Sequence, residues 1–139
     1  MSESLRLGVA GLGTVGSALI QLVHNKQNML ADRCGRTIRV TGINARTAGL
    51  DRGFSTDGIT WFDTPAELAT SDDVDVFVEL MGGEDEPALG AVKAALNAGK
   101  HVVTANKALL AKHGVELAQI AEDNGVLLNY EAAVAGGIP

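Results

Sequence analysis

Three glycines near the N-terminus, Gly11, Gly13 and Gly16, constrain the fold more than any other feature of the chain. They follow the short apolar run Leu5–Ala10, which is typical of a buried parallel strand, and they precede apolar residues at helical spacing. A strand, a GxGxxG turn and a helix in this order are the context in which the motif binds a dinucleotide. The first glycine permits a tight turn, the second lets the backbone approach a pyrophosphate, and the third lets helix and strand pack closely. We therefore predict a dinucleotide-binding turn. A glycine-rich turn without a ligand is the alternative, because the motif alone has low specificity.

Beyond this turn, strand-like and helix-like patterns alternate along the chain. Further strands are predicted at residues 37–44, 59–62, 74–80, 101–104 and 126–130. Helices are predicted from residue 15 to just before Gly35, after Thr64-Pro65, from residues 84–87 to near Gly99, and over residues 107–123, with residues 45–58 as an exposed loop. The alternation predicts an α/β fold, a doubly wound (Rossmann), mostly parallel six-stranded sheet with helices on both faces. Residues 1–130 would form this dinucleotide-binding domain.

Composition and charge limit the classes of partner. The chain has 139 residues, the size of one domain, with 46% hydrophobic and 20% charged residues, as in ordinary soluble globular proteins. A net charge of −6 argues against nucleic acid or an anionic membrane as a general partner. No apolar run is long enough to span a membrane, and the N-terminus lacks the pattern of a signal peptide. Cys34 is the single cysteine, which suits a reducing compartment. We expect a cytoplasmic protein.

The end of the second predicted strand bears on the choice of nicotinamide cofactor. An NAD-preferring site usually has an acid there, bonded to the ribose hydroxyls. This chain instead reads Ile43-Asn44-Ala45-Arg46-Thr47. Arg46 is placed to pair with a 2′-phosphate, which would favour NADP by roughly 10- to 100-fold. We predict NADP, with NAD still possible, and a solvated loop arginine is the alternative interpretation of Arg46.

Three blocks of sequence resemble the nucleotide-binding half of homoserine dehydrogenases. They are Gly11-Leu12-Gly13-Thr14-Val15-Gly16, then Glu79-Leu80-Met81-Gly82-Gly83 with Val102–Leu110, and finally Glu131–Pro139. The resemblance implies an oxidoreductase that interconverts homoserine and aspartate semialdehyde with NAD or NADP, in threonine, methionine and isoleucine biosynthesis. It also implies a homodimer for the full-length protein. Residues 131–139 would begin the connection to a substrate domain that carries the general acid–base lysine, so this chain is expected to bind cofactor without turnover.

The resemblance also implies roles for individual residues. Thr14 and Val15 would contact the pyrophosphate, and the Gly82-Gly83 turn would lie beside the cofactor. Lys107 would lie at the nicotinamide end as a catalytic and cofactor-binding residue, because a cation there favours negative charge developing on oxygen. A helix-surface lysine is the alternative interpretation. Asn106 is expected to cap the helix rather than to act chemically.

A cation site, usually occupied by sodium, is implied at the C-terminal end of the chain. Glu131, Val134, Gly136 and Ile138 match the family's positions for it, with one carboxylate and three backbone carbonyls as hard oxygen ligands. Glu131 would also approach the nicotinamide. The alternative interpretation of this segment is an interdomain hinge without an ion.

Other polar residues are predicted to be structural. The histidines show no metal-ligand spacing, His101 is expected to be structural, and Trp61 to pack at the sheet edge. The acids at 72–73 and 84–86 are expected in solvated turns, the second group also suiting the positive end of a helix dipole. Two other functions stay open: the first half of another two-domain NAD(P)-dependent dehydrogenase, and a non-enzymatic NAD(P)-sensing domain.

Overall fold

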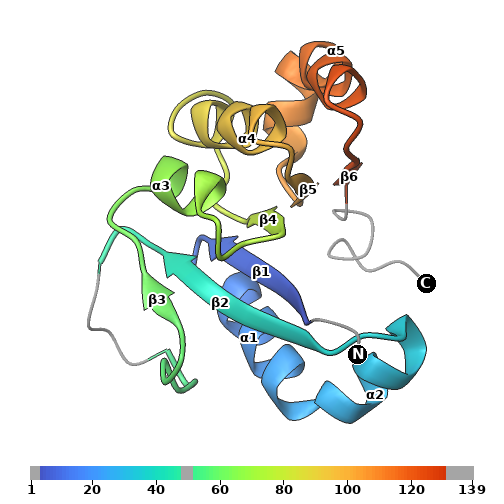
Figure 1. Ribbon diagram of the computed structural model, residues 1–139. Coiled ribbons are helices and arrows are strands. Elements are labelled where there is room, and N and C mark those ends of the chain that lie inside the picture. The colour runs from blue at the N-terminus through green and yellow to red at the C-terminus, as the bar shows by residue number, and fades with distance from the viewer. Residues whose placement is uncertain (1–3, 48–51, 131–139) are drawn as a thin grey trace, which may run out of the picture.

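In a computed structural model, which describes residues 4–47 and 52–130, six strands form one parallel sheet (Figure 1). The strands are β1 (Leu5–Ala10), β2 (Ile38–Asn44), β3 (Thr60–Trp61), β4 (Val76–Glu79), β5 (His101–Thr104) and β6 (Leu128–Tyr130). Their order across the sheet is β3-β2-β1-β4-β5-β6, and every neighbouring pair is parallel. This is the strand order of the doubly wound dinucleotide-binding fold, so the predicted fold class is confirmed.

Helices cover both faces of the sheet. They are α1 (Thr14–Asn25), α2 (Gln27–Cys34), α3 (Pro65–Thr70), α4 (Ala88–Asn97) and α5 (Lys107–Asp123). Figure 1 shows α1 and α2 on one side and α3, α4 and α5 on the other. Each side has its own apolar cluster, because successive residues of a strand point to opposite faces. In β4, for example, Val76 and Val78 belong to the cluster beneath α1, whereas Phe77 belongs to the cluster beneath α3, α4 and α5.

The first predicted helix is wrong in one respect, because the structure divides it into two. Lys26 leaves helical geometry (φ −116°, ψ 30°) between α1 and α2. The apolar stripe of α1 continues to Val23, whereas α2 has no fully buried residue and contacts the same apolar cluster through the partly buried Leu30. Gly35 then ends α2 in the left-handed conformation (φ 73°), as its position predicts.

Several local predictions are confirmed. Thr64 caps α3 by accepting a hydrogen bond from Glu67 N (3.1 Å), with Pro65 as the first helical residue. Trp61 lies in edge strand β3 and packs against the apolar cluster under α1. His101 is structural: its Nδ1 accepts a hydrogen bond from Leu127 N (3.0 Å), next to the start of β6.

Strand ends differ slightly from the prediction. Strand β4 begins at Val76 rather than at residue 74, and β6 begins at Leu128 rather than at residue 126. Val74 is still fully buried, but its amide bonds the carbonyl of Ser71 in a turn instead of a neighbouring strand. In the part of the chain that the structure describes, no helix combines the length and the apolar character needed to cross a membrane.

Candidate functional site

One row of residues across the sheet defines the edge at which the candidate site lies. Ala10 pairs with Asn44 on one side and with Glu79 on the other, and Glu79 pairs in turn with Thr104. These residues end β2, β1, β4 and β5, so the loops that follow all leave the sheet at the same edge. Parallel sheets of this order bind ligands there, where the order reverses between β1 and β4.

The glycine turn lies at the centre of this edge. Gly11 has φ +100°, and a Cβ atom added to it would lie 2.5 Å from Leu80 O. A Cβ atom at Gly16 would lie 1.9 Å from Gly11 O, so α1 packs directly on the turn. Nothing lies within 4 Å of a Cβ atom at Gly13, whose backbone faces open space. The three glycines thus meet the three physical demands of a dinucleotide turn: a tight turn, an open approach and close packing.

The N-terminus of α1 opens into this space. Gly13 is the N-cap and supplies no side-chain acceptor, so the first amides of the helix have no side-chain cap. Thr14 and Val15 are exposed, with 52% of Val15 accessible. Free amide groups together with the positive end of the helix dipole form a suitable site for a phosphate. These residues therefore fit a pyrophosphate group, even though the chain as a whole is acidic.

A hollow of about 260 Å³ lies at the same edge, beyond the end of β2. It is lined by Asn44, Ala45, Arg46, Asp63, Pro65, Met81, Gly82 and Pro87. Asn44 is buried and donates a hydrogen bond through Nδ2 to Phe62 O (2.8 Å), whereas Arg46 is exposed. Arg46 and Gly82, two predicted site residues, therefore share one hollow.

Asp63 also lines this hollow, and sequence reasoning assigned it no role. The sequence did hold a signal for it, because Asp63 directly follows the third predicted strand. The carboxyl end of a parallel strand lies at the ligand edge, so the residue after β3 lies near the residues after β2. The lining of the hollow consequently includes one positively charged side chain, Arg46, and one negatively charged side chain, Asp63.

Glu79 is a fully buried charged group of the site. Its side chain is fully inaccessible, and its carboxylate accepts hydrogen bonds from Thr104 Oγ1 (2.6 Å), Met81 N (2.8 Å) and Gly82 N (3.2 Å). Asn106 Nδ2 lies 3.5 Å from the same carboxylate. The carboxylate therefore joins the loop after β4 to the end of β5. The sequence marked this residue only as part of a family-like block, since a lone glutamate in a strand gives no sign of its partners.

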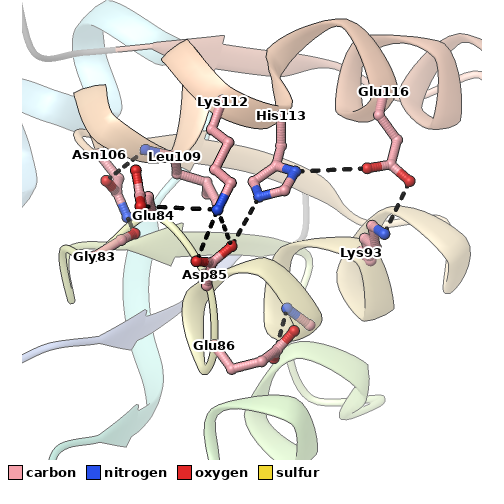
Figure 2. A network of polar contacts seen from close by, with 11 residues as sticks. Gly83, Glu84, Asp85, Glu86, Lys93, Asn106, Leu109, Lys112, His113 and Glu116 are labelled. Atoms are coloured by element: carbon pink, nitrogen blue, oxygen red, sulfur yellow. Dashed lines mark hydrogen bonds and ion pairs between the residues drawn. The ribbon is translucent and has the colours of Figure 1, made fainter.

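Asn106 and Lys107 begin α5 beside that loop. Asn106 Oδ1 caps the helix by accepting from Leu109 N (3.0 Å), which confirms the predicted cap. Its Nδ2 donates to Gly83 O (2.7 Å), as Figure 2 shows. Lys107 is the first helical residue and is exposed. The structure thus brings Gly82, Gly83 and Lys107 to the same edge as the glycine turn.

The loop after β4 is also tied to α5 by an ion-pair network (Figure 2). Both carboxylate oxygens of Asp85 lie 3.0 Å from Lys112 Nζ, and one lies 3.1 Å from His113 Nε2. Glu84 Oε1 lies 3.7 Å from the same Lys112 ammonium. The hydrogen bond from Lys112 holds the pKa of Asp85 below its usual 3.8, with His113 acting in the same direction. Asp85 in turn raises the pKa of Lys112 above its usual 10.5.

The prediction of solvated acids at 84–86 is therefore incomplete. All three side chains are exposed, but each has a partner, and Glu86 Oε1 accepts a hydrogen bond from Gly90 N (3.0 Å) in α4. Helix α4 begins only at Ala88, so its first turn holds no acid and Glu86 meets the helix from outside. The sequence could not show these partners, because Lys112 and His113 lie more than twenty residues away.

The remaining predicted site residues cannot be placed in the structure. Glu131, Val134, Gly136 and Ile138 lie outside the described residues. Within 4–47 and 52–130, no group of three or more His, Cys, Asp or Glu side chains is arranged to hold a metal ion. Another hollow, of about 440 Å³, lies between α1 and residues 54–59. The glycine turn contributes nothing to its lining.

Comparisons with known proteins agree with this geometry. The family described as "Homoserine dehydrogenase, NAD binding domain" matches residues 11–131. A homoserine dehydrogenase of Mycobacterium tuberculosis is 47% identical over 133 residues, which are 96% of this chain and 30% of that protein. A crystal structure of Staphylococcus aureus homoserine dehydrogenase at pH 8.5 superposes with a TM-score of 0.85 at 34% identity, over 96% of this chain and 33% of that one. A homoserine dehydrogenase structure from Thiobacillus denitrificans has a TM-score of 0.83 at 37% identity, over 94% of this chain and 30% of that one.

The match covers very different shares of this chain and of its relatives. The chain spans about 30% of the length of the curated relatives that it matches, while nearly all of its own length takes part in the match. The shared region is the parallel sheet with its helices.

Proposed function

Because the chain belongs to the family of homoserine dehydrogenase NAD-binding domains, we propose that its glycine turn holds the pyrophosphate of a nicotinamide dinucleotide at the N-terminus of α1. One observation carries this proposal: the first amides of α1 have no side-chain cap, and the space around the Cβ position of Gly13, the residue before them, is open. Gly11, Gly13 and Gly16 shape the turn, and Thr14 and Val15 offer the amides. Gly82 and Gly83 then flank the cofactor from the next strand.

Within that site we propose NADP as the preferred cofactor, with NAD as a weaker ligand. Support comes from the hollow after β2, where Arg46 is available and buried Asn44 stands where an NAD-type acid is usual. An arginine guanidinium binds a 2′-phosphate through paired hydrogen bonds. Asp63 in the same hollow works against a second anion, so the preference for NADP is expected to be moderate.

For the complete protein we propose hydride transfer between homoserine and aspartate semialdehyde. Lys107 would contribute the positive charge at the nicotinamide end, since it begins α5 at the ligand edge. Glu131 would lie near the nicotinamide and, with Val134, Gly136 and Ile138, would hold a sodium ion. A homodimer in the cytoplasm is proposed on family resemblance alone. This chain by itself should bind cofactor without turnover.

The relatives weigh against the two alternative functions. Another two-domain dehydrogenase would not be expected to share 47% identity with a homoserine dehydrogenase over 96% of this chain. A pure sensor domain would use the glycine turn but would give Lys107 no role. Turnover of homoserine by the complete protein separates these functions, and in the enzyme Lys107→Ala should lower turnover more than it lowers cofactor affinity.

The decisive experiment for this chain is a calorimetric titration with NADPH and with NADH, in sodium and in potassium buffers. We expect both to bind, NADPH about 10-fold tighter, with the difference removed by Arg46→Ala. Arg33→Ala, which changes an exposed arginine in the last turn of α2, is the matched control and should leave both affinities unchanged. Equal affinities in the unaltered chain would refute the role of Arg46, and absence of any binding would refute the proposed site.

A further inference from the structure

A buried carboxylate at the ligand edge has only neutral hydrogen-bond donors. Glu79 is fully inaccessible, and its four close donors are two backbone amides, the Thr104 hydroxyl and the Asn106 side-chain amide. No ion pair among the residues that the structure describes includes Glu79. A charge removed from water in this way is costly unless hydrogen bonds or an opposite charge compensate it, and here only neutral donors do so.

The hydrogen-bond pattern fits an ionised glutamate and disfavours a glutamine. Donors approach both oxygens: Met81 N and Gly82 N approach Oε2, and Thr104 Oγ1 approaches Oε1. The Thr104 hydroxyl accepts from Asn106 N (3.0 Å), so its own proton is directed to the carboxylate. An ionised carboxylate is an acceptor at both oxygens, whereas a glutamine side chain must present a donor on one side.

The position of the Glu79 carboxylate in the sheet indicates which half of the cofactor would lie nearest to it. In a sheet of this strand order, the adenine ribose contacts the residues after β2, and the dinucleotide crosses the point where the order reverses. The nicotinamide half would then lie over the ends of β4 and β5. Glu79 and Thr104 end those two strands, and Glu79 bonds the amides that lead into Gly82-Gly83. The charge therefore belongs to the nicotinamide side of the site.

We propose that Glu79 is a positioning residue whose buried negative charge makes the site prefer the oxidised cofactor over the reduced one. This inference rests on the proposed function. The oxidised nicotinamide ring carries a positive charge and the reduced ring is neutral, so a fixed anion in a low-dielectric setting stabilises only the first. The same carboxylate holds Met81 and Gly82 in the loop, and it reaches the start of α5 through Thr104 and Asn106.

The test is the ratio of two affinities, which a merely structural role would not change. The chain is titrated by calorimetry with NADP⁺ and with NADPH, unaltered and as Glu79→Gln and Glu79→Asp. Glu79→Gln keeps the size of the side chain and removes its charge, so we expect the ratio to move roughly 5- to 20-fold toward NADPH. Glu79→Asp keeps the charge on a shorter side chain, so both affinities should fall while the ratio stays close to that of the unaltered chain. An equal loss of both affinities in Glu79→Gln would overturn the inference.

A second variant keeps the test decisive if Glu79→Gln fails to fold. Thr104→Val removes the shortest neutral donor and leaves the carboxylate charge less compensated. The ratio should then move toward NADP⁺, and an unchanged ratio or a move toward NADPH would overturn the inference. Failure of the proposed function is seen separately, because the unaltered chain would then bind neither form, and the inference would fall with it. If the unaltered chain binds NADP⁺ and NADPH but the affinity ratios of the variants do not change as expected, the role of Glu79 is refuted and the proposed function is not.

Discussion

Asn106 joins the loop after β4 to the start of α5 with one side chain: its Nδ2 donates to Gly83 O at 2.7 Å, and its Oδ1 accepts from Leu109 N at 3.0 Å. The first bond holds the turn after β4, and the second caps the helix that starts with Lys107. Because Asn106 is 5% exposed, water cannot readily replace either bond. The orientation of the Gly82-Gly83 turn and the start of α5 therefore depend on each other.

Replacing this residue should affect stability as well as the site. Asn106→Ala removes the cap and the loop contact, and we expect a loss of about 2 kcal/mol in the free energy of unfolding, measured by urea titration. Asn106→Asp keeps the cap acceptor but places a second carboxylate near Glu79, whose Oε2 lies 3.5 Å from Nδ2. The aspartate variant should therefore be at least as unstable as the alanine variant, and an aspartate variant with unaltered stability would contradict this account.

Two glycines of the turn should respond differently to a methyl group. A Cβ atom at Gly16 would lie 1.9 Å from the backbone oxygen of Gly11, so Gly16→Ala must shift the turn and should lower both the melting temperature and cofactor affinity. Gly13 has φ −75° and ψ −156°, which alanine adopts, and open space around its Cβ position. Gly13→Ala should then fold with a loss of about 0.5 kcal/mol as an N-cap change.

The Gly13→Ala variant should also be affected in cofactor binding. The methyl group at residue 13 occupies the space through which a pyrophosphate would approach, so Gly13→Ala should weaken NADPH binding about 10-fold or more with little change in melting temperature. Calorimetry and thermal melts of both variants are the measurements. A Gly13→Ala chain that binds as tightly as the unaltered one would show that phosphate does not approach there.

The sequence predicted those parts of the fold that follow from local patterns. The six strands apart from their ends, the glycine turn, the helix start at Thr64-Pro65 and the cap at Asn106 each depend on a few neighbouring residues, and all are confirmed. The break at Lys26 was missed because no proline or glycine marks it, and the next such residue along the chain is Gly35.

Most of the site contacts that the sequence did not predict join segments far apart in the chain. Glu79 meets Thr104 and Asn106, twenty-five and twenty-seven residues later, only because β4 and β5 pair in register. Asp85 meets Lys112 because α5 packs against the loop after β4. Asp63 differs, because its place after a strand was readable from the sequence once the strand order was assumed.

Asp63 should oppose a phosphate in the hollow that it shares with Arg46. Asp63→Asn removes one negative charge at nearly constant volume, so NADPH affinity should rise about threefold while NADH affinity changes less. Asp57→Asn is the control, because Asp57 is equally exposed but lines a different hollow. Titration of both variants with both cofactors is the measurement, and an equal gain for NADH would mean that Asp63 does not face the 2′-phosphate.

Acid should weaken a contact between β1 and the start of β4. Arg6 donates to Asp75 from Nη2 (3.0 Å), from Nε (3.2 Å) and from its backbone amide (2.9 Å). The side-chain hydrogen bond from Arg6 is the main reason that the pKa of Asp75 lies below its usual 3.8. A carboxyl with a lowered pKa stabilises the fold above its unfolded pKa, and this contribution is lost as the pH falls through the folded pKa.

Asp75→Asn should therefore lower the melting temperature by roughly 3 °C between pH 5 and 7, as one partly exposed charge-assisted contact would. The difference from the unaltered chain should shrink as the pH falls below 3.8 and through the lowered pKa of folded Asp75, because protonation removes the charge-assisted part of the contact. Asp72→Asn, a change of an exposed acid three residues away, is the matched control variant. A difference between Asp75→Asn and the unaltered chain that does not shrink at all as the pH falls would show that packing around the side chain, and not its charge, stabilises this contact.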